Sequence, residues 1–309
     1  MLPLVTDAQA RDAVSAQDAI RIVEQTYGDL GSSRASLSDP ELMRLDHDAR
    51  GFALKGAVLD RYGAAGLRVI PSHLGGGNGW CLLLETASGR PLARVEETWL
   101  HRLRTAASAV VAARLLARAD SRVLTLVGTG RIADLVPAAC AAGFAVEEIR
   151  VVGRRAGVAT DFAARHSAGG VKMAAYDSLD EAAAGADVIV AVTSATQPVI
   201  HARHLEPGCA VIGLGGGAEI AGGVLLRSDR FYVDELGFAR TVGSVAGWLE
   251  DGLALGELRA RLTGSLSAVV NGEVPGRTSP DERILAVVQG VAACDVALAC
   301  LVIQRLGLG

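Results

Sequence analysis

The segment from Arg122 to Arg155 constrains the fold most, because it reads in order as strand, glycine turn, helix and strand. The β-branched run Arg122–Val127 predicts a buried strand, and Glu148–Val152 predicts a second one. Between them lies a G-x-G-x-x-A turn, Gly128 to Ala133, followed by the apolar spacing of a packed helix over Ile132–Ala142. We therefore expect a dinucleotide site; the alternative is a βα turn that binds nothing. The expected cofactor-binding residues here are Gly128, Thr129, Gly130, Arg131 and Ile132.

The end of the second strand indicates which dinucleotide binds. A site for NAD usually places an acidic residue there to bind the ribose 2′-hydroxyl, whereas this chain has Gly153-Arg154-Arg155. Two guanidinium groups suit a 2′-phosphate, so we expect NADP(H) to be favoured over NAD(H), with these three residues at the site. The alternative is that both arginines are solvated at the start of the next helix.

The composition excludes several classes of protein. At 309 residues, half of them hydrophobic and 21% charged, the chain is long enough for two domains and too apolar to be disordered. A net charge of −4 and an aromatic share of 4% predict no nucleic-acid partner. Five scattered cysteines without a C-x-x-C pair indicate reduced thiols rather than a disulfide or zinc framework. Because Asp7, Arg11 and Asp12 stand where a secretory signal would be apolar, we expect a cytoplasmic protein.

An apolar segment near the C-terminus has the length and hydrophobicity of a possible membrane span. The segment Ile284–Ile303 is interrupted only by Gln289, Gly290 and Asp295, as expected for a helix that is buried nearly all round. An aspartate near the centre of a span is costly in lipid. We therefore expect a helix buried between subunits, and no membrane partner.

Strands and helices alternate after Arg155, which predicts a doubly wound parallel sheet. Before Arg122, an amphipathic helix from Thr6 to about Gly31 precedes short strands and an alanine-rich helix over Arg104–Arg118. We therefore expect an α/β fold, with a Rossmann domain at residues 120–280 and a smaller α+β domain formed by residues 1–119 with 281–309. The expected elements are strands 66–71, 80–85, 91–95, 171–174, 187–192, 210–214 and 230–233, and helices 156–166 and 179–184.

Seven sequence blocks resemble, in the same order, those of the ornithine cyclodeaminase/μ-crystallin family. They are Phe52-Ala53-Leu54-Lys55, Pro71-Ser72-His73, Ser88-Gly89-Arg90-Pro91-Leu92-Ala93, Leu103-Arg104-Thr105-Ala106-Ala107-Ser108, Val127 to Ala133, Val192-Thr193-Ser194-Ala195, and Gly276-Arg277-Thr278-Ser279-Pro280-Asp281-Glu282. The resemblance covers nearly the whole chain. It implies a homodimer in which the N-terminal sheet and the last helix form a substrate-binding and dimerisation domain. It further implies an NAD(P) domain, and a 2-amino or 2-imino acid bound at the cleft between the two. On this resemblance, Thr105, Thr193, Ser194 and Ala195 are added to the cofactor-binding residues.

Two basic residues are the main candidates for substrate chemistry. A guanidinium at a helix start can clamp a carboxylate, and by resemblance to the family's R-T-A-A block Arg104 would bind the substrate carboxylate. The alternative for Arg104 is an inter-domain salt bridge. Lys55 is one of only two lysines and lies in an apolar strand, where partial desolvation would lower the pKa of its ammonium and suit it to proton transfer. Its spacing from Pro71 resembles that of the family's active-site lysine; the alternative is an edge-strand lysine that faces water.

Three further residues are candidates. Arg34 is assigned as the family's second carboxylate-binding arginine, and Arg44 competes with it because neither arginine has a distinctive flanking sequence. His73 is a candidate proton carrier, with a structural turn histidine as the alternative.

One loop departs from the family pattern. Cyclodeaminases carry an aspartate, followed shortly by proline-glycine-lysine, after the fifth Rossmann strand, and that aspartate handles the substrate's amino group and ring closure. Here the loop reads Gly213-Leu214-Gly215-Gly216-Gly217-Ala218-Glu219-Ile220, with glycine in place of the aspartate. We expect the three consecutive glycines to leave an open backbone next to the nicotinamide. Glu219 is a candidate catalytic replacement, or alternatively a cap of the next helix.

The missing aspartate and the expected NADP(H) preference both favour net reduction. Hydride exchange at the α-carbon of an amino acid gives a reductase when it runs once, and a cyclodeaminase when it runs out and back around a nitrogen attack. We therefore expect an NADP(H)-dependent reductase of 2-imino acids or cyclic ketimines, with Lys55 as proton donor and Arg104 as carboxylate anchor. The alternatives are a redox-neutral cyclodeaminase or amino-acid condensing enzyme, and an NADP(H)-binding protein without catalytic activity.

Overall fold

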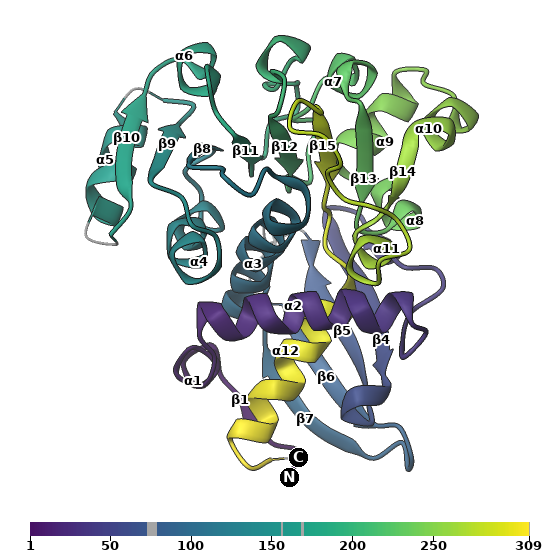
Figure 1. The fold of residues 1–309 in the computed structure, drawn as a ribbon. Helices are drawn as coiled ribbons and strands as arrows, with labels where there is room; N and C mark the ends of the chain where they lie inside the picture. Colours follow the sequence, from purple (N-terminus) through teal and green to yellow (C-terminus); the bar gives the residue numbers. More distant parts are fainter. Residues whose placement is uncertain (73–78, 156, 168–169, 309) are drawn as a thin grey trace. The chain divides into compact units, whose positions relative to one another are not determined.

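The computed structural model describes residues 1–72, 79–155, 157–167 and 170–308, which divide into two compact units (Figure 1). The first unit comprises residues 1–104 and 291–309, and the second comprises residues 105–290. The boundaries differ from the expected ones at 119/120 and 280/281. The helix α3 (Thr98–Leu116) contributes to both units, and the strand β15 (Ile284–Val287) belongs to the sheet of the second.

The first unit is a seven-stranded sheet with helices against one face. The strand order is β1-β7-β6-β5-β4-β2, with β3 also paired to β4, and all pairs except β1-β7 are antiparallel. Helix α12 packs against β4, β5 and β6, and α2 packs against α12 (Figure 1). The elements are β1 (Leu4–Val5), α1 (Asp7–Ala13), α2 (Ala16–Gly31), β2 (Ala35–Leu37), β3 (Met43–His47), β4 (Arg50–Leu59), β5 (Ala64–Pro71), β6 (Trp80–Glu85), β7 (Pro91–Glu96) and α12 (Ala292–Arg305).

Two helix predictions were wrong, one within this unit and one for a segment that belongs partly to the second unit. The expected single helix from Thr6 to Gly31 is two helices, because Ser15 interrupts the first one and caps α2 through a reciprocal pair of hydrogen bonds with Asp18. The expected helix Ile284–Ile303 is strand β15 followed by α12, with Gly290 at a φ of +85° in the connection. A continuous apolar run does not distinguish a buried strand from a buried helix. No helix among the described residues is long and apolar enough to cross a membrane.

The second unit confirms the predicted Rossmann architecture. Its eight strands are all parallel, in the order β10-β9-β8-β11-β12-β15-β13-β14, and the chain order reverses between β8 and β11. Besides β15, the strands are β8 (Val123–Val127), β9 (Glu148–Val152), β10 (Lys172–Tyr176), β11 (Val188–Ala191), β12 (Ala210–Gly213), β13 (Arg230–Val233) and β14 (Leu262–Ser265). The helices are α4 (Val136–Gly143), α5 (Val158–His166), α6 (Leu179–Ala183), α7 (Gly222–Arg227), α8 (Leu236–Ala239), α9 (Gly243–Glu250), α10 (Leu255–Arg261) and α11 (Leu266–Val270).

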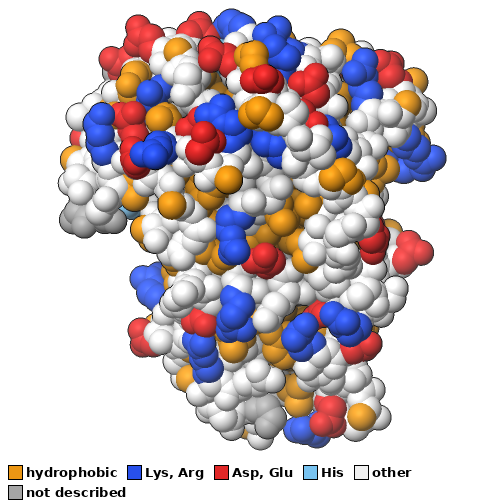
Figure 2. All heavy atoms as spheres, in the orientation of Figure 1, with side chains coloured by type: hydrophobic (Ala, Val, Ile, Leu, Met, Phe, Trp, Pro, Cys, Tyr) orange, Lys and Arg blue, Asp and Glu red, His pale blue; other side chains and the backbone are white. Residues whose placement is uncertain are grey.

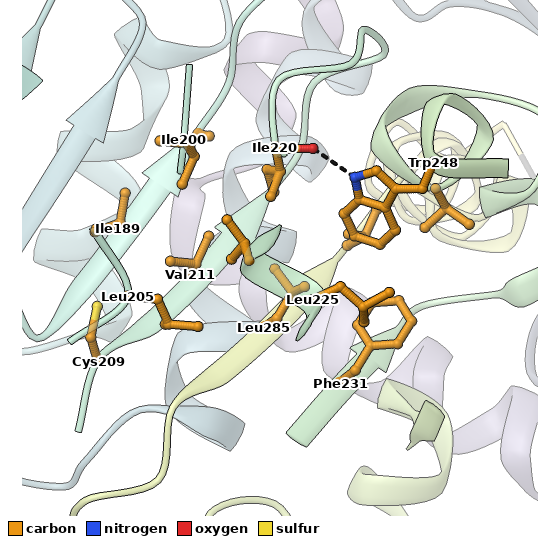
Figure 3. Packing of buried hydrophobic residues seen from close by; sticks show 14 of the residues in the cluster. Ile189, Ile200, Leu205, Cys209, Val211, Ile220, Leu225, Phe231, Trp248 and Leu285 are labelled. Atoms are coloured by element: carbon orange, nitrogen blue, oxygen red, sulfur yellow. Dashed lines mark hydrogen bonds between the residues drawn. The ribbon is translucent and has the colours of Figure 1, made fainter. Parts of the chain in front are cut away.

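The core of the second unit lies on the sheet beneath α7 and α9. Figure 3 shows Val211 and Leu285 from neighbouring strands packed toward Trp248 of α9, whose ring meets that of Phe231 edge to face. The buried indole also donates a hydrogen bond of 2.7 Å to the backbone oxygen of Ile220. Tryptophan N–H groups need such a partner when they are buried. This bond therefore fixes the segment that follows β12.

Charges and thiols agree with the composition. All five cysteines are free and buried, as expected for reduced core thiols. On the face shown in Figure 2, acidic and basic side chains are interspersed, without a large patch of either sign. This face therefore shows no basic field of the kind that attracts nucleic acid.

Candidate active site

The glycine turn after β8 is shaped as the sequence predicts. Gly128 has a φ of +117°, and a Cβ at this position would lie 2.5 Å from the backbone oxygen of Val192, so a larger residue does not fit. A Cβ at Gly130 would meet open space, which leaves room for a ligand beside the backbone. The predicted helix start at Ile132 was wrong, because a short 3₁₀ turn (Ala133–Leu135) precedes α4. Pro137 lies in the first turn of α4, where proline is tolerated.

A cavity of about 720 Å³ opens at the carboxyl ends of the strands of the second unit. Open parallel α/β sheets bind nucleotides at this edge, where the strand order reverses. Nine of the predicted cofactor-binding residues line the cavity, namely Gly128, Thr129, Gly130, Gly153, Arg154, Arg155, Thr193, Ser194 and Ala195. Among the described residues, Thr105, Arg131 and Ile132 do not line it, and Thr105 is buried within α3. The cofactor roles of these three residues stay predictions.

Arg154 and Arg155 lie exposed at the end of β9, on the wall of this cavity. The position after β9 where an acidic residue would hold a ribose 2′-hydroxyl is thus occupied by two cations. The alternative of a solvated helix start stays open, although α5 begins only at Val158, beyond both arginines.

Sequence reasoning missed a hydrogen-bonded group of titratable residues that also lines this cavity. Asp180 of α6 accepts hydrogen bonds from Nε of Arg203 at 2.7 Å and from Nε2 of His204 at 2.6 Å, and all three residues line the cavity. The Nδ1 atom of His204 accepts from the backbone N–H of His201, so Nε2 carries the proton. Hydrogen bonds from Arg203 and His204 lower the pKa of Asp180. The sequence signal that could have identified these residues is their position, because they follow the strands β10 and β11.

Glu219 does not face the cavity. Its side chain is fully buried, and its carboxylate accepts hydrogen bonds from Thr193 and Gly215. Burial raises the pKa of Glu219, and the backbone N–H groups of Gly215 and Thr193 oppose that rise. These contacts favour a structural role over the predicted catalytic one.

The prediction of an open glycine backbone in this loop was wrong for Gly215 and Gly217. A Cβ at Gly215 would meet the Glu219 carboxylate and would lie 2.5 Å from the backbone oxygen of Thr193. A Cβ at Gly217 would meet the backbone oxygen of Ala195. Glycine is therefore needed at 215 and 217 because two loops approach closely, whereas a Cβ at Gly216 would make only an ordinary contact with Val242.

The first unit buries a cluster of charged side chains that sequence reasoning missed. Arg68 of β5 donates to Glu97 from Nε at 2.8 Å and from Nη2 at 2.9 Å, and its Nη1 lies 2.9 Å from Oδ2 of Asp295 in α12. Arg104 donates from Nε to Oδ1 of Asp295 at 2.8 Å, and its Nη2 lies 2.8 Å from Nδ1 of His101. We call these five residues the charge cluster. Its members come from segments far apart in sequence, so no local pattern identified it.

Burial and the two guanidinium groups determine the pKa shifts within the charge cluster. Burial alone would raise the pKa of Asp295, but Arg104 and Arg68 hold it far below its usual range. Desolvation and the neighbouring Arg104 lower the pKa of His101 to about 4. His101 is therefore neutral at pH 7, and its Nδ1 can accept a hydrogen bond from Arg104.

The structure brings Lys55 and Arg104 to this same cluster. Lys55 of β4 is directly opposite Arg68 in the antiparallel register, so both side chains lie on one face of the sheet. Lys55 is only 5% exposed and β4 is an interior strand, so the alternative of a water-facing edge lysine was wrong. Arg104 lies within α3, which begins at Thr98, so the expected helix start at Arg104 was also wrong. Helix-end stabilisation of an anion therefore does not apply there.

The remaining candidates are placed less favourably. Arg34 is 57% exposed and pairs with Asp29 at 2.9 Å, and its backbone bonds to Asp60 beyond the end of β4. Arg44 of β3 is opposite Ala53, which shares a sheet face with Lys55. This register favours Arg44 over Arg34 as a neighbour of Lys55. His73 lies outside the described residues.

A model of the ornithine cyclodeaminase/mu-crystallin family matches residues 71–307 of the chain. The chain belongs to this family. A Rhizobium meliloti protein provisionally named a dehydrogenase is 30% identical, over 98% of this chain and 95% of that protein. The Delta(1)-pyrroline-2-carboxylate reductase of Bacillus cereus is 27% identical, over 74% of this chain and 71% of that protein. Among solved structures, an archaeal alanine dehydrogenase dimer with bound NAD has a TM-score of 0.89 at 25% identity, covering 98% of this chain and 95% of that chain.

The family assignment supports an enzyme and its cofactor class. Family members are NAD(P)-dependent oxidoreductases or cyclodeaminases. The likeness to the alanine dehydrogenase extends over both units, and that protein binds NAD. The cavity at the glycine turn of this chain is lined by nine of the residues predicted to bind a dinucleotide.

Proposed function

We propose that the protein is an NADP(H)-dependent reductase of 2-imino acids or cyclic ketimines. The observation that carries this proposal is the loop after β12. From Gly213 to Ala218 it has no acidic side chain, and Glu219 is buried and bonded to backbone N–H groups. A ring-closing reaction needs a base to manage the side-chain amine, whereas reduction of an imine does not.

The proposed preference for NADP(H) rests on Arg154 and Arg155. Guanidinium groups bind phosphate oxygens through charge-assisted hydrogen bonds, and both arginines stand at the position that discriminates the two dinucleotides. The reduced dinucleotide would supply a hydride to the α-carbon. A redox-neutral enzyme retains its oxidised cofactor, so an NADP(H) preference also supports net reduction.

The proposed substrate residues are Lys55 and Arg104. Lys55 would donate the proton that the imine nitrogen takes up, and its burial at 5% exposure excludes water from that step. Arg104 would bind the substrate carboxylate while its Nε is held by Asp295. Catalytic and substrate-binding roles for Glu219 and Arg34 are not part of this proposal, because their contacts engage them elsewhere.

We also propose a homodimer in the cytoplasm. The sheet face opposite Lys55 exposes large apolar side chains, as a subunit contact would. These are Met43, Leu45, Phe52, Val58 and Leu67. Free buried cysteines fit a reducing compartment. The molar mass measured by light scattering after size-exclusion chromatography would test the dimer, and a monomeric mass at micromolar concentration would contradict it.

The second candidate function is a redox-neutral cyclodeaminase or amino-acid condensing enzyme. The family name itself favours it, because ornithine cyclodeaminases are members. Such an enzyme would turn over an amino acid with no net change in the cofactor.

NADPH oxidation by the purified protein tests the proposal. The substrates are pyrroline-2-carboxylate, piperideine-2-carboxylate, and pyruvate with ammonia, each followed by absorbance of the reduced nicotinamide. Oxidation with any of them is the expected result, and their relative rates rank cyclic against open-chain imines. NADPH binding without oxidation by any of them would contradict the reductase, and would leave the second candidate or a binding protein without turnover.

A further inference from the structure

One buried side chain ties the loop after β11, which lines the dinucleotide cavity, to the neighbouring loop after β12. Oε2 of Glu219 accepts hydrogen bonds from the backbone N and from Oγ1 of Thr193, each at 2.8 Å. Oε1 of Glu219 accepts from the backbone N of Gly215 at 2.6 Å. Thr193 follows β11 and Gly215 follows β12, so this carboxylate bridges the ends of two neighbouring strands.

The same residue also fixes the far end of the cavity wall. The backbone oxygen of Glu219 accepts from the N–H groups of Val199 at 2.9 Å and Ile200 at 3.0 Å. Within the wall, the hydroxyl of Thr193 accepts from the backbone N of Ala195 at 3.2 Å. Glu219 therefore holds both ends of the segment 193–199, and much of that segment lines the cavity.

Glu219 is itself held rigidly by the core. The next residue, Ile220, donates its N–H to Oγ of Ser244 at 3.1 Å and accepts from the indole of Trp248, as Figure 3 shows for the latter bond. The close approach of Gly215 and Gly217 to the loop after β11 leaves that loop little room to shift. Groups that orient a binding wall act best when they are immobilised in this way.

We propose that Glu219 is a positioning residue that shapes the part of the cavity receiving the nicotinamide half of the dinucleotide. In a Rossmann sheet the cofactor crosses the switch point, so its two halves lie over opposite sides of it. Of the residues that line the cavity, Arg154 at the end of β9 marks the adenosine side, and Thr193 after β11 marks the other. This inference rests on the dinucleotide binding of the proposed function and does not depend on which substrate is reduced.

The chemistry of the side chain gives the inference a direct test. A carboxylate accepts at both oxygens, whereas the amide of glutamine accepts at only one, so E219Q leaves one of the two loops without its partner. We expect E219Q to weaken NADPH binding about tenfold, because hydrogen bonds to a charged group are lost at the wall. Adenosine 2′,5′-bisphosphate, which lacks the nicotinamide half, should lose less than about twofold. Both dissociation constants are measured by titration calorimetry.

The outcomes separate this inference from the proposed function. If the unaltered protein binds neither NADPH nor NADH, the proposed cofactor fails. If it binds NADPH and E219Q binds it equally well, the positioning role is overturned. An equal loss for NADPH and for the bisphosphate would also overturn it, because a general disturbance of the unit affects both ligands alike.

If E219Q does not fold, the variants T193V and T193S test the same positioning role. T193V removes only the hydroxyl that donates to Glu219, and T193S restores it with a smaller side chain. We expect the loss of NADPH affinity to be larger in T193V than in T193S, with the bisphosphate affinity little changed in either. The reverse order, or equal losses in both variants, would contradict a role for this hydrogen bond.

Discussion

In the first unit the buried carboxylates of Glu97 and Asp295 face guanidinium groups, whereas in the second unit the buried carboxylate of Glu219 faces backbone N–H groups. The first arrangement orients side chains, because Arg68 and Arg104 are themselves held by the carboxylates. The second arrangement orients loops, because its donors belong to the main chain. Under the proposed function, the first unit carries the substrate chemistry and the second unit shapes the cofactor site.

The largest expected effect comes from breaking the charge cluster. D295A would leave Arg68 and Arg104 buried without one of their carboxylates, and loss of one partner of a buried ion pair costs about 4 kcal/mol of unfolding free energy. Urea unfolding measures this cost. D120A is the matched control, because Asp120 is 78% exposed and its pair with Arg118 contributes less than about 1 kcal/mol. Equal costs for the two variants would remove the distinction between buried and exposed pairs.

The next effect tests whether the first unit carries the chemistry. K55M should lower kcat for imine reduction about a hundredfold, which is about 2.7 kcal/mol, while NADPH binding in the second unit is retained. K172M is the control, because Lys172 is the only other lysine and is 71% exposed. Steady-state rates and a separate NADPH titration measure the two quantities. Intact turnover in K55M would refute the proposed proton donor.

Glu282 is another carboxylate of the second unit, and the pH dependence of its contribution to stability tests the comparison of the two units. Burial raises the pKa of Glu282, but hydrogen bonds from Thr278 and Arg230 outweigh it and lower the pKa from 4.5 to about 2. Since the folded-state pKa is lowered, the stabilisation is present above about pH 4.5 and is lost as pH falls toward about pH 2.

We expect E282Q to lose about 2 kcal/mol of unfolding free energy at pH 7, with the difference from the unaltered protein shrinking below about pH 4.5. Urea unfolding at several pH values measures it, with E257Q as the control because Glu257 is half exposed. A difference that stays constant down to pH 3 would show that the ionised carboxylate is not the cause.

The smallest effect concerns cofactor preference. Replacing Arg154 and Arg155 together by serine should weaken NADPH binding about tenfold, or about 1.4 kcal/mol, and leave NADH binding within about twofold. R165S is the control, because Arg165 is a surface arginine of the same unit, 57% exposed in α5. The ratio of the two dissociation constants is the measured quantity. An unchanged ratio would show that the arginines are solvated and do not select the cofactor.

The predictable part of the fold was local. The strands Glu148–Val152, Trp80–Glu85 and Arg230–Val233 have the predicted limits, because each is a short apolar run that ends at a turn. The glycine turn and the two arginines after β9 were also predicted, since one segment of sequence contains strand, turn and strand together. The run from Ile284 failed because a parallel sheet buries its inner strands on both faces, which removes the alternation that identifies a strand.

The unpredicted part of the site depends on contacts between distant segments. Arg104 and Asp295 meet across 191 positions, and Arg68 joins them from a third segment. Glu219 looked like a replacement for a missing catalytic group because its sequence position is close to the loop. The burial of Glu219 could not be predicted, because it depends on how closely the loop after β11 approaches it in the fold. Such residues are fixed by packing rather than by local propensity.

The most direct test of net reduction is the stoichiometry of a single reaction mixture. Pyrroline-2-carboxylate and deuterated NADPH, labelled at the transferred position of the nicotinamide, are incubated with the protein, and proline is quantified by mass spectrometry. The proposed reductase predicts one NADPH oxidised for each proline formed, with deuterium at the α-carbon. Amino-acid turnover without loss of NADPH, or product without deuterium, would contradict it.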